Sequence, residues 1–167
     1  MLTSLEDLYD KAQPHVALFN AFAQKHALLG KAAADHIGYK CASRESYEHN
    51  RVWFEETAEY SFQTMISGRR VSTIKLKQPL DTTLGPIWFL ELSDQKPDTS
   101  QTEGFDHAEI YPTGISYEGL IHHIEQNDEV QKIERPHHTT YDIRVGNGFV
   151  VRLEEEALVD KIRSTQM

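Results

Sequence analysis

Three features are scarce in this chain, and each scarcity excludes a class of protein. Cys41 is the single cysteine, so no disulfide forms within the chain, which fits a reducing compartment. The 17 Lys and Arg are outnumbered by 26 Asp and Glu, and the resulting net charge of −9 repels the phosphate backbone of nucleic acid. No apolar run approaches the length that spans a bilayer, and the start MLTSLEDLYD is acidic where a signal peptide is basic. We therefore expect a cytoplasmic protein with neither a nucleic-acid nor a membrane partner.

The first thirty residues are expected to be a helical extension. Thr3 and Glu6 have the spacing of a capping box, and apolar residues recur at helical intervals up to Gly30. Pro14 suits the first turn of a helix better than its interior, which predicts a pair of helices in this extension. No chemistry is assigned to it.

Beyond Gly30 the chain contains the same unit twice. Residues 31–93 show the patterns of a strand, a helix and three strands, and residues 105–167 repeat that order after a polar loop at 94–104. Three matches between the units support the repeat: Asp35-His36 with Asp106-His107, Ser46-Tyr47-Glu48 with Ser116-Tyr117-Glu118, and the six-residue step from Gly85 to Glu91 with that from Gly148 to Glu154. At 167 residues the chain has room for one ordinary domain, so residues 31–167 are predicted to be a single α+β domain of two βαβββ units.

The repeated histidines and glutamates are expected to share one face of the sheet. Strand side chains alternate between faces, and His36 and His107 lie opposite the apolar residues of their segments. The same parity separates Glu91 and Glu154 from the apolar residues of the last strand in each unit. Two units side by side would curl one concave sheet around these four side chains. Two imidazoles and two carboxylates without thiolate suit a divalent metal such as Zn, Ni, Mn or Fe.

Several segments resemble one enzyme superfamily. FDHAEIY is similar to the histidine-bearing strand of glyoxalases, and WFLELSD is similar to their glutamate-bearing strand. The set ADHIGYK, SGRR and EGFDHAEIYP resembles the YecM-like proteins of the vicinal oxygen chelate superfamily, which includes glyoxalase I, extradiol dioxygenases and bleomycin resistance proteins. The resemblance covers about residues 30–160. It implies a concave, barrel-like mixed sheet of the glyoxalase/bleomycin resistance type, small-molecule substrates and a metal held near the sheet centre.

The resemblance implies metal ligands at His36, Glu91, His107 and one residue of the last strand. Counting from the Gly148 turn as in glyoxalases would place Arg152 at that fourth position. The internal repeat places Glu154 there instead, and a carboxylate binds a cation whereas a guanidinium does not. Glu154 is therefore the predicted fourth ligand.

Other groove residues are candidates for further roles. A glutamate displaced from the metal, Glu154 or Glu91, has the chemistry of a general base, and Glu109 is a candidate for that role or for supporting His107. Three basic residues with groove parity are candidates to bind substrate, namely Lys75, Arg144 and Arg152.

Each of these residues also has a simpler interpretation. A single strand histidine is usually structural, Glu109 is more often a solvated carboxylate, and strand lysines and arginines are usually solvated charges. Two functions therefore stay open: a metal-dependent isomerase, lyase or dioxygenase acting on a small oxygen-rich molecule, or a protein that only sequesters a ligand in the same groove, as bleomycin resistance proteins do. The sequence also leaves open whether the groove closes within one chain or between two chains of a homodimer.

Overall fold

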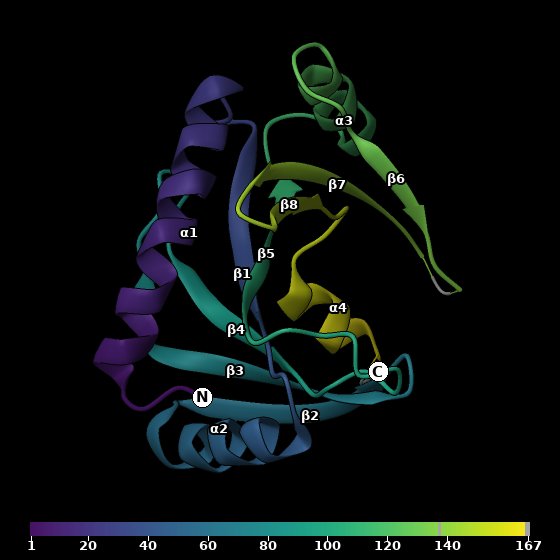
Figure 1. Ribbon diagram of the computed structural model, residues 1–167. Helices are drawn as coiled ribbons and strands as arrows, with labels where there is room; N and C mark the ends of the chain where they lie inside the picture. The colour runs from purple at the N-terminus through teal and green to yellow at the C-terminus, as the bar shows by residue number, and fades with distance from the viewer. Residues whose placement is uncertain (137, 166–167) are drawn as a thin grey trace.

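A computed structural model describes residues 1–136 and 138–165. Its eight strands form one mixed sheet in the order β2-β3-β4-β1-β5-β8-β7-β6, so β2 and β6 are the edge strands (Figure 1). The first unit consists of β1 (Ala32–Lys40), α2 (Arg44–Thr57), β2 (Tyr60–Ile66), β3 (Arg69–Leu80) and β4 (Ile87–Ser93). The second consists of β5 (Gly104–Pro112), α3 (Tyr117–Glu125), β6 (Gln131–Glu134), β7 (Thr139–Gly146) and β8 (Phe149–Leu153). The predicted pair of βαβββ units is confirmed.

The two units meet at the centre of the sheet. β1 runs antiparallel to β5, and each of these first strands pairs on its other side with the last strand of its own unit, in parallel. The pairing is therefore the same in both units, as the repeat in the sequence requires. Because Gly38 on β1 pairs with His107 on β5, the two histidine-bearing segments lie side by side at this seam.

One face of the sheet is apolar and the other is polar. Leu90 of β4, Ile110 of β5 and Val151 of β8 are fully buried and belong to a core cluster that also includes residues of α1, α2 and α3. Each such side chain stabilises the fold by roughly 1.5–3 kcal/mol through its burial. In Figure 1 these three helices lie outside the curved sheet, whereas the concave side holds α4 (Leu158–Thr165). The concave side is left for polar residues, as the alternation along the strands predicts.

The N-terminal extension is a single helix, α1 (Leu5–Lys25), and the predicted helical pair is wrong. Pro14 lies inside this helix, where a proline removes one backbone donor and need not end the helix if packing holds it. The helix also starts one residue later than its capping signal predicts. The N-cap is Ser4, whose hydroxyl accepts from the Asp7 backbone N–H at 3.0 Å, while the Asp7 carboxylate accepts from the Thr3 N–H at 2.9 Å.

The chain after the last strand forms an element that the sequence analysis missed. β8 ends at Leu153, so Glu154 follows the strand although its backbone N–H still donates to the Ile110 carbonyl at 3.0 Å. Helix α4 then begins with Leu158, whose N–H donates to the Asp35 carboxylate at 2.9 Å. The C-terminal helix is thereby tied to β1 on the concave side. Across the described part of the chain, none of the helices is both long enough and apolar enough to span a bilayer.

Candidate metal centre

Each Asp-His dipeptide sits at an irregularity in the β1–β5 pairing. Ala34 pairs with Ile110 and Ile37 with Ala108, so two residues of β1 face one residue of β5 at Asp35-His36. A second shift leaves Asp106 as an extra residue on β5 beside His107. A β-bulge redirects side chains locally, which lets neighbouring aspartate and histidine side chains meet although regular strand geometry would send them to opposite faces. Each copy of the Asp-His dipeptide therefore lies at a β-bulge.

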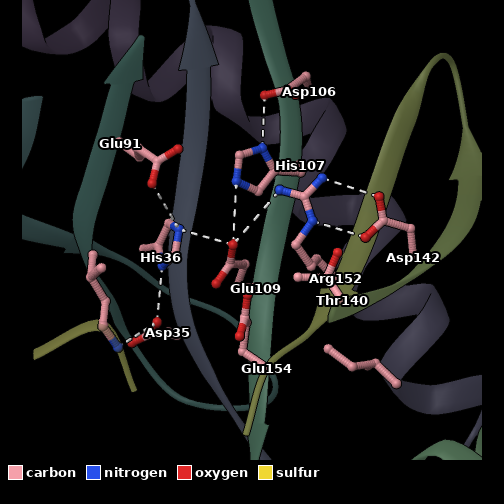
Figure 2. A network of polar contacts seen from close by, with 12 residues as sticks. Asp35, His36, Glu91, Asp106, His107, Glu109, Thr140, Asp142, Arg152 and Glu154 are labelled. Carbon is pink, nitrogen blue, oxygen red and sulfur yellow. Dashed lines mark hydrogen bonds and ion pairs between the residues drawn. The ribbon is translucent and has the colours of Figure 1, made fainter. Parts of the chain in front are cut away.

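The two bulges give both imidazole rings the same contact with the preceding aspartate. Both rings are buried, and their centroids lie 5.8 Å apart in an edge-to-face arrangement. The Nδ1 of His36 lies 2.9 Å from the Asp35 carboxylate, and the Nδ1 of His107 lies 2.9 Å from the Asp106 carboxylate (Figure 2). A carboxylate at Nδ1 fixes the tautomer that leaves the Nε2 lone pair free for a metal. Both Nε2 atoms are buried and have no hydrogen-bond partner among the described residues.

Two carboxylates approach these unpartnered nitrogens. Glu91 Oε2 lies 3.7 Å from His36 Nε2, and Glu109 Oε1 lies 3.5 Å from His36 Nε2 and 3.8 Å from His107 Nε2 (Figure 2). These distances are too long for hydrogen bonds. They suit atoms that share a metal, because ligands about 2.1 Å from one ion are about 3 Å apart at right angles and about 4 Å apart when opposite. The residues of this centre therefore fit a divalent ion.

A glycine makes room for the second ring. A Cβ added to Gly38 would lie 2.2 Å from Cε1 of His107 and 2.5 Å from its Nδ1. No side chain fits that space unless the ring moves, so Gly38 is required by close approach. Sequence reasoning missed this role, and the signal available was the position of Gly38 two residues after His36 on the same strand face.

Electrostatics favour positive charge at the centre. Burial lowers the pKa of His36, but the carboxylates of Glu109, Asp35 and Glu91 outweigh it and raise that pKa to about 9. Burial also raises the pKa of Glu109, an effect that the two imidazoles only partly offset. Without a metal, therefore, a proton on His36 balances the surrounding carboxylates, and a bound cation would take over that role.

The strand register gives Arg152, and not Glu154, the position in the second unit that Glu91 has in the first. Glu91 on β4 pairs with Gly38, two residues after His36, and Arg152 on β8 pairs with Glu109, two residues after His107. The glycine-to-glutamate count misaligned the units because Glu91 lies six residues after Gly85, whereas the residue in the equivalent register, Arg152, lies only four after Gly148. The register thus agrees with the glyoxalase-like count, which gave Arg152.

The charge of Arg152 is balanced by Asp142 on the neighbouring strand β7. Its Nε and Nη2 donate to the two carboxylate oxygens of Asp142 on β7 at 2.8 and 3.1 Å, and its Nη1 lies 3.8 Å from Glu109 Oε1 (Figure 2). Asp142 was not among the predicted site residues. The guanidinium therefore lies beside Glu109, close to the two histidines, from the position that Glu91 has in the first unit.

Glu154 lies in the same cavity but in a different cluster. Its Oε2 accepts from Lys161 of α4 at 2.6 Å, and its Oε1 lies 3.5 Å from His138 Nε2. Among the described residues, the groups whose ligand atoms all lie within 4.8 Å of one another are His36 with Glu91 and His107, and Asp35 with His36 and Glu109. Glu154 belongs to neither group, so its role as a ligand stays a prediction without support from the geometry.

The centre opens into a cavity of about 700 Å³ that is lined by residues of both units and by Leu158 and Lys161 of α4. All four of the predicted ligands line it, as do Glu109 and Arg152. Of the predicted substrate-binding residues, Lys75 and Arg144 are absent from the described residues that line it. Lys75 instead donates to Glu59 at 2.8 Å, and Arg144 is exposed.

Comparison with known proteins agrees with this architecture. The family model described as "YecM protein" matches residues 5–154. Protein YecM of Escherichia coli strain K12 is 28% identical over 115 residues, which span 66% of this chain and 61% of that protein, so the match covers less than two thirds of the relative's length. The solved structure of protein EC4020 from structural genomics superposes with a TM-score of 0.72 at 20% identity, over 98% of this chain and 93% of that one.

A second solved structure is more distant. A variant of methylmalonyl-CoA epimerase from Streptomyces coelicolor, in complex with 2-nitronate-propionyl-CoA, gives a TM-score of 0.45 at 15% identity, over 72% of this chain and 94% of that chain. The family match covers most of the sequence, and the paired βαβββ units form one mixed sheet. The chain belongs to the YecM family.

Proposed function

We propose that this chain is a metal-dependent enzyme of vicinal oxygen chelate type that acts on a small, oxygen-rich molecule. In this proposal the metal ligands are Nε2 of His36 and His107 and the carboxylates of Glu91 and Glu109. The observation that carries it is the pair of buried Nε2 atoms that lack a hydrogen-bond partner among the described residues and face two carboxylates at 3.5–3.8 Å. A buried polar atom without a partner costs roughly 1–3 kcal/mol, so such a pair calls for a ligand.

The donor atoms limit which metals suit the site and which chemistry a bound metal would supply. Two imidazole nitrogens and two carboxylate oxygens suit Zn, Ni, Mn or Fe. A divalent metal bound here would supply Lewis acidity, polarising an oxygen of the substrate in an isomerase, lyase or dioxygenase reaction. The protein residues prepare this site, since Asp35 and Asp106 hold the two imidazoles and Arg152 lies beside Glu109.

Glu154 is proposed as the proton acceptor beside the metal rather than as its ligand. It is buried, lines the cavity and is oriented by Lys161 of α4. A general base must reach the substrate from the cavity wall, and a residue outside the ligand cluster keeps its carboxylate available for that purpose.

Metal content tests the proposal before any substrate is known. Purified protein, stripped with a chelator and then dialysed against Zn, Ni, Mn or Fe(II), is expected to retain about one ion per chain of at least one of these metals. Elemental analysis after gel filtration measures the ratio. If none of the four metals stays bound above the level of a denatured sample, the enzyme proposal is wrong.

A further inference from the structure

Some of the basic side chains that line the cavity are paired with a carboxylate and others are not. Six lysines and arginines line it: Lys40, Arg69, Lys96, Arg135, Arg152 and Lys161. Three of them contact a carboxylate, with Lys40 2.6 Å from Asp106, Arg152 2.8 Å from Asp142 and Lys161 2.6 Å from Glu154. Lys96 is exposed to solvent. This leaves Arg69 and Arg135 as partly buried cations, and neither has a carboxylate within 4.0 Å in the described part of the chain.

Arg135 lies on the second unit, just after β6. Its Nη1 donates to the Thr140 hydroxyl, and its backbone N–H donates to the His138 carbonyl at 3.0 Å. The guanidinium is thus held by neutral groups. Burial, and then the nearby charge of Arg152, lower the pKa of Arg135. Burial and Arg152 outweigh the carboxylates of Asp142, Glu154 and Glu109, which raise the pKa of Arg135 from farther away.

Arg69 occupies the corresponding situation on the first unit. It begins β3, its Nη1 donates to the neutral Gln101 amide oxygen, and its buried Nε has no hydrogen-bond partner among the described residues. Gln101 in turn donates to the Cys41 carbonyl at 2.8 Å, which fixes it. Both units therefore present a positioned guanidinium to the cavity without a counter-ion among the described residues.

A shortage of acidic residues does not explain this arrangement. The chain carries 26 Asp and Glu against 17 Lys and Arg, so acidic partners are abundant. Arginines that are fully buried are almost always paired, and the guanidinium fork matches a carboxylate or a phosphate group. An unpaired guanidinium in a ligand-sized cavity indicates that the ligand supplies the anion.

We propose that the substrate is an anion and that Arg135 binds its carboxylate or phosphate group. Its other end would present oxygens to the metal, and this part of the inference rests on the proposed function. The substrate class is then a small oxygenated carboxylic acid or phosphate ester. Arg152 is excluded from this role because two of its guanidinium nitrogens already donate to Asp142.

Anion binding by metal-free protein tests the assignment. Inorganic phosphate and acetate would be titrated separately into chelator-treated protein, at an ionic strength held constant with chloride, and followed by NMR shifts of the arginine side chains. At least one of the two anions is expected to bind, and the tighter one identifies the group. Arg135→Met should weaken that binding by at least about tenfold.

Arg144→Met is the matched control, because Arg144 is an exposed arginine on β7 that is not among the described residues lining the cavity. It should bind the anion as the wild type does, and thermal melts of both variants should show intact folds. Equal binding by Arg135→Met and wild type, or no binding of either anion above chloride, would overturn the assignment. Because the assay contains no metal, failure of the metal site would leave this result unchanged, and the two proposals fail separately.

Discussion

Replacing either histidine of the centre, in His36→Ala or His107→Ala, is expected to lower the affinity for the preferred metal by more than about 100-fold. In the proposed site each imidazole would supply one of two nitrogen donors, and loss of a ligand should exceed the roughly 10- to 100-fold effect of losing a residue that only supports a ligand. Competition with a chromophoric chelator measures the affinity of each variant. The exposed His122, altered in His122→Ala, is the control and should leave affinity unchanged.

The same variants separate a metal site from a structural role. Each alanine variant loses one hydrogen bond, between Nδ1 and the neighbouring aspartate, but none at Nε2, and the ring lies on the polar side of the sheet and not in the apolar core. Circular dichroism should therefore show native secondary structure in both alanine variants, and in His36→Gln and His107→Gln as milder replacements. Folded variants with wild-type metal affinity would contradict the ligand assignment, and unfolding of all four would make the histidines structural.

Glu109→Gln is expected to weaken metal binding by about 10- to 100-fold, whereas Glu154→Gln should change it less than about threefold. Glu109 lies within 3.8 Å of both unpartnered nitrogens, and Glu154 is bonded instead to Lys161. Both replacements keep size and remove charge, so each controls for the other. The same chelator competition applies.

The internal repeat of the sequence predicts the opposite order for these two glutamates. If Glu154→Gln weakened binding more than Glu109→Gln, the repeat would identify the ligand correctly and the strand register would not. Arg152→Gln gives a further check. It should weaken binding through loss of the contact with Glu109 at 3.8 Å, by less than Glu109→Gln itself.

The fold was predictable because the two patterns that indicate it can be recognised in the sequence without knowing which strands pair. The alternation of apolar and polar residues within each strand identified the buried face, and Leu90 and Val151 are buried there as expected. The second signal was the repeat itself, since Asp35-His36 and Asp106-His107 fall at the same point of two similar units. Three members of the centre, His36, Glu91 and His107, follow from these two signals alone.

The fourth proposed ligand, the carboxylate of Glu109, was not predictable because it depends on pairing between strands. Counting residues from Gly85 and Gly148 assumes an equal spacing in both units, but Glu91 lies six residues after Gly85 and its register equivalent Arg152 lies four after Gly148. The bulges that bring Asp35 and Asp106 to Nδ1 of their histidines also depend on the register between β1 and β5. No local pattern in a single sequence encodes such a register.

Two helices, α1 and α4, were also predicted poorly because their structure depends on tertiary contacts. Pro14 predicted a break that α1 does not have, because tertiary packing of residues such as Phe19 and Phe22 outweighs one missing donor. Helix α4 was overlooked because the acidic run Glu154–Glu156 precedes it, although Leu158, Lys161 and Ile162 have helical spacing. Its position inside the concave sheet depends on a contact with Asp35, far away in sequence.

The claim on which this account depends is that one ion is held by imidazoles from both units. X-ray absorption spectroscopy of protein loaded with one equivalent of zinc measures this directly. We predict nitrogen and oxygen neighbours at about 2.0–2.2 Å from the zinc, with the multiple scattering of two imidazole rings. Coordination by one imidazole or none would contradict the account, since the two bulges at the seam would then not serve a shared metal.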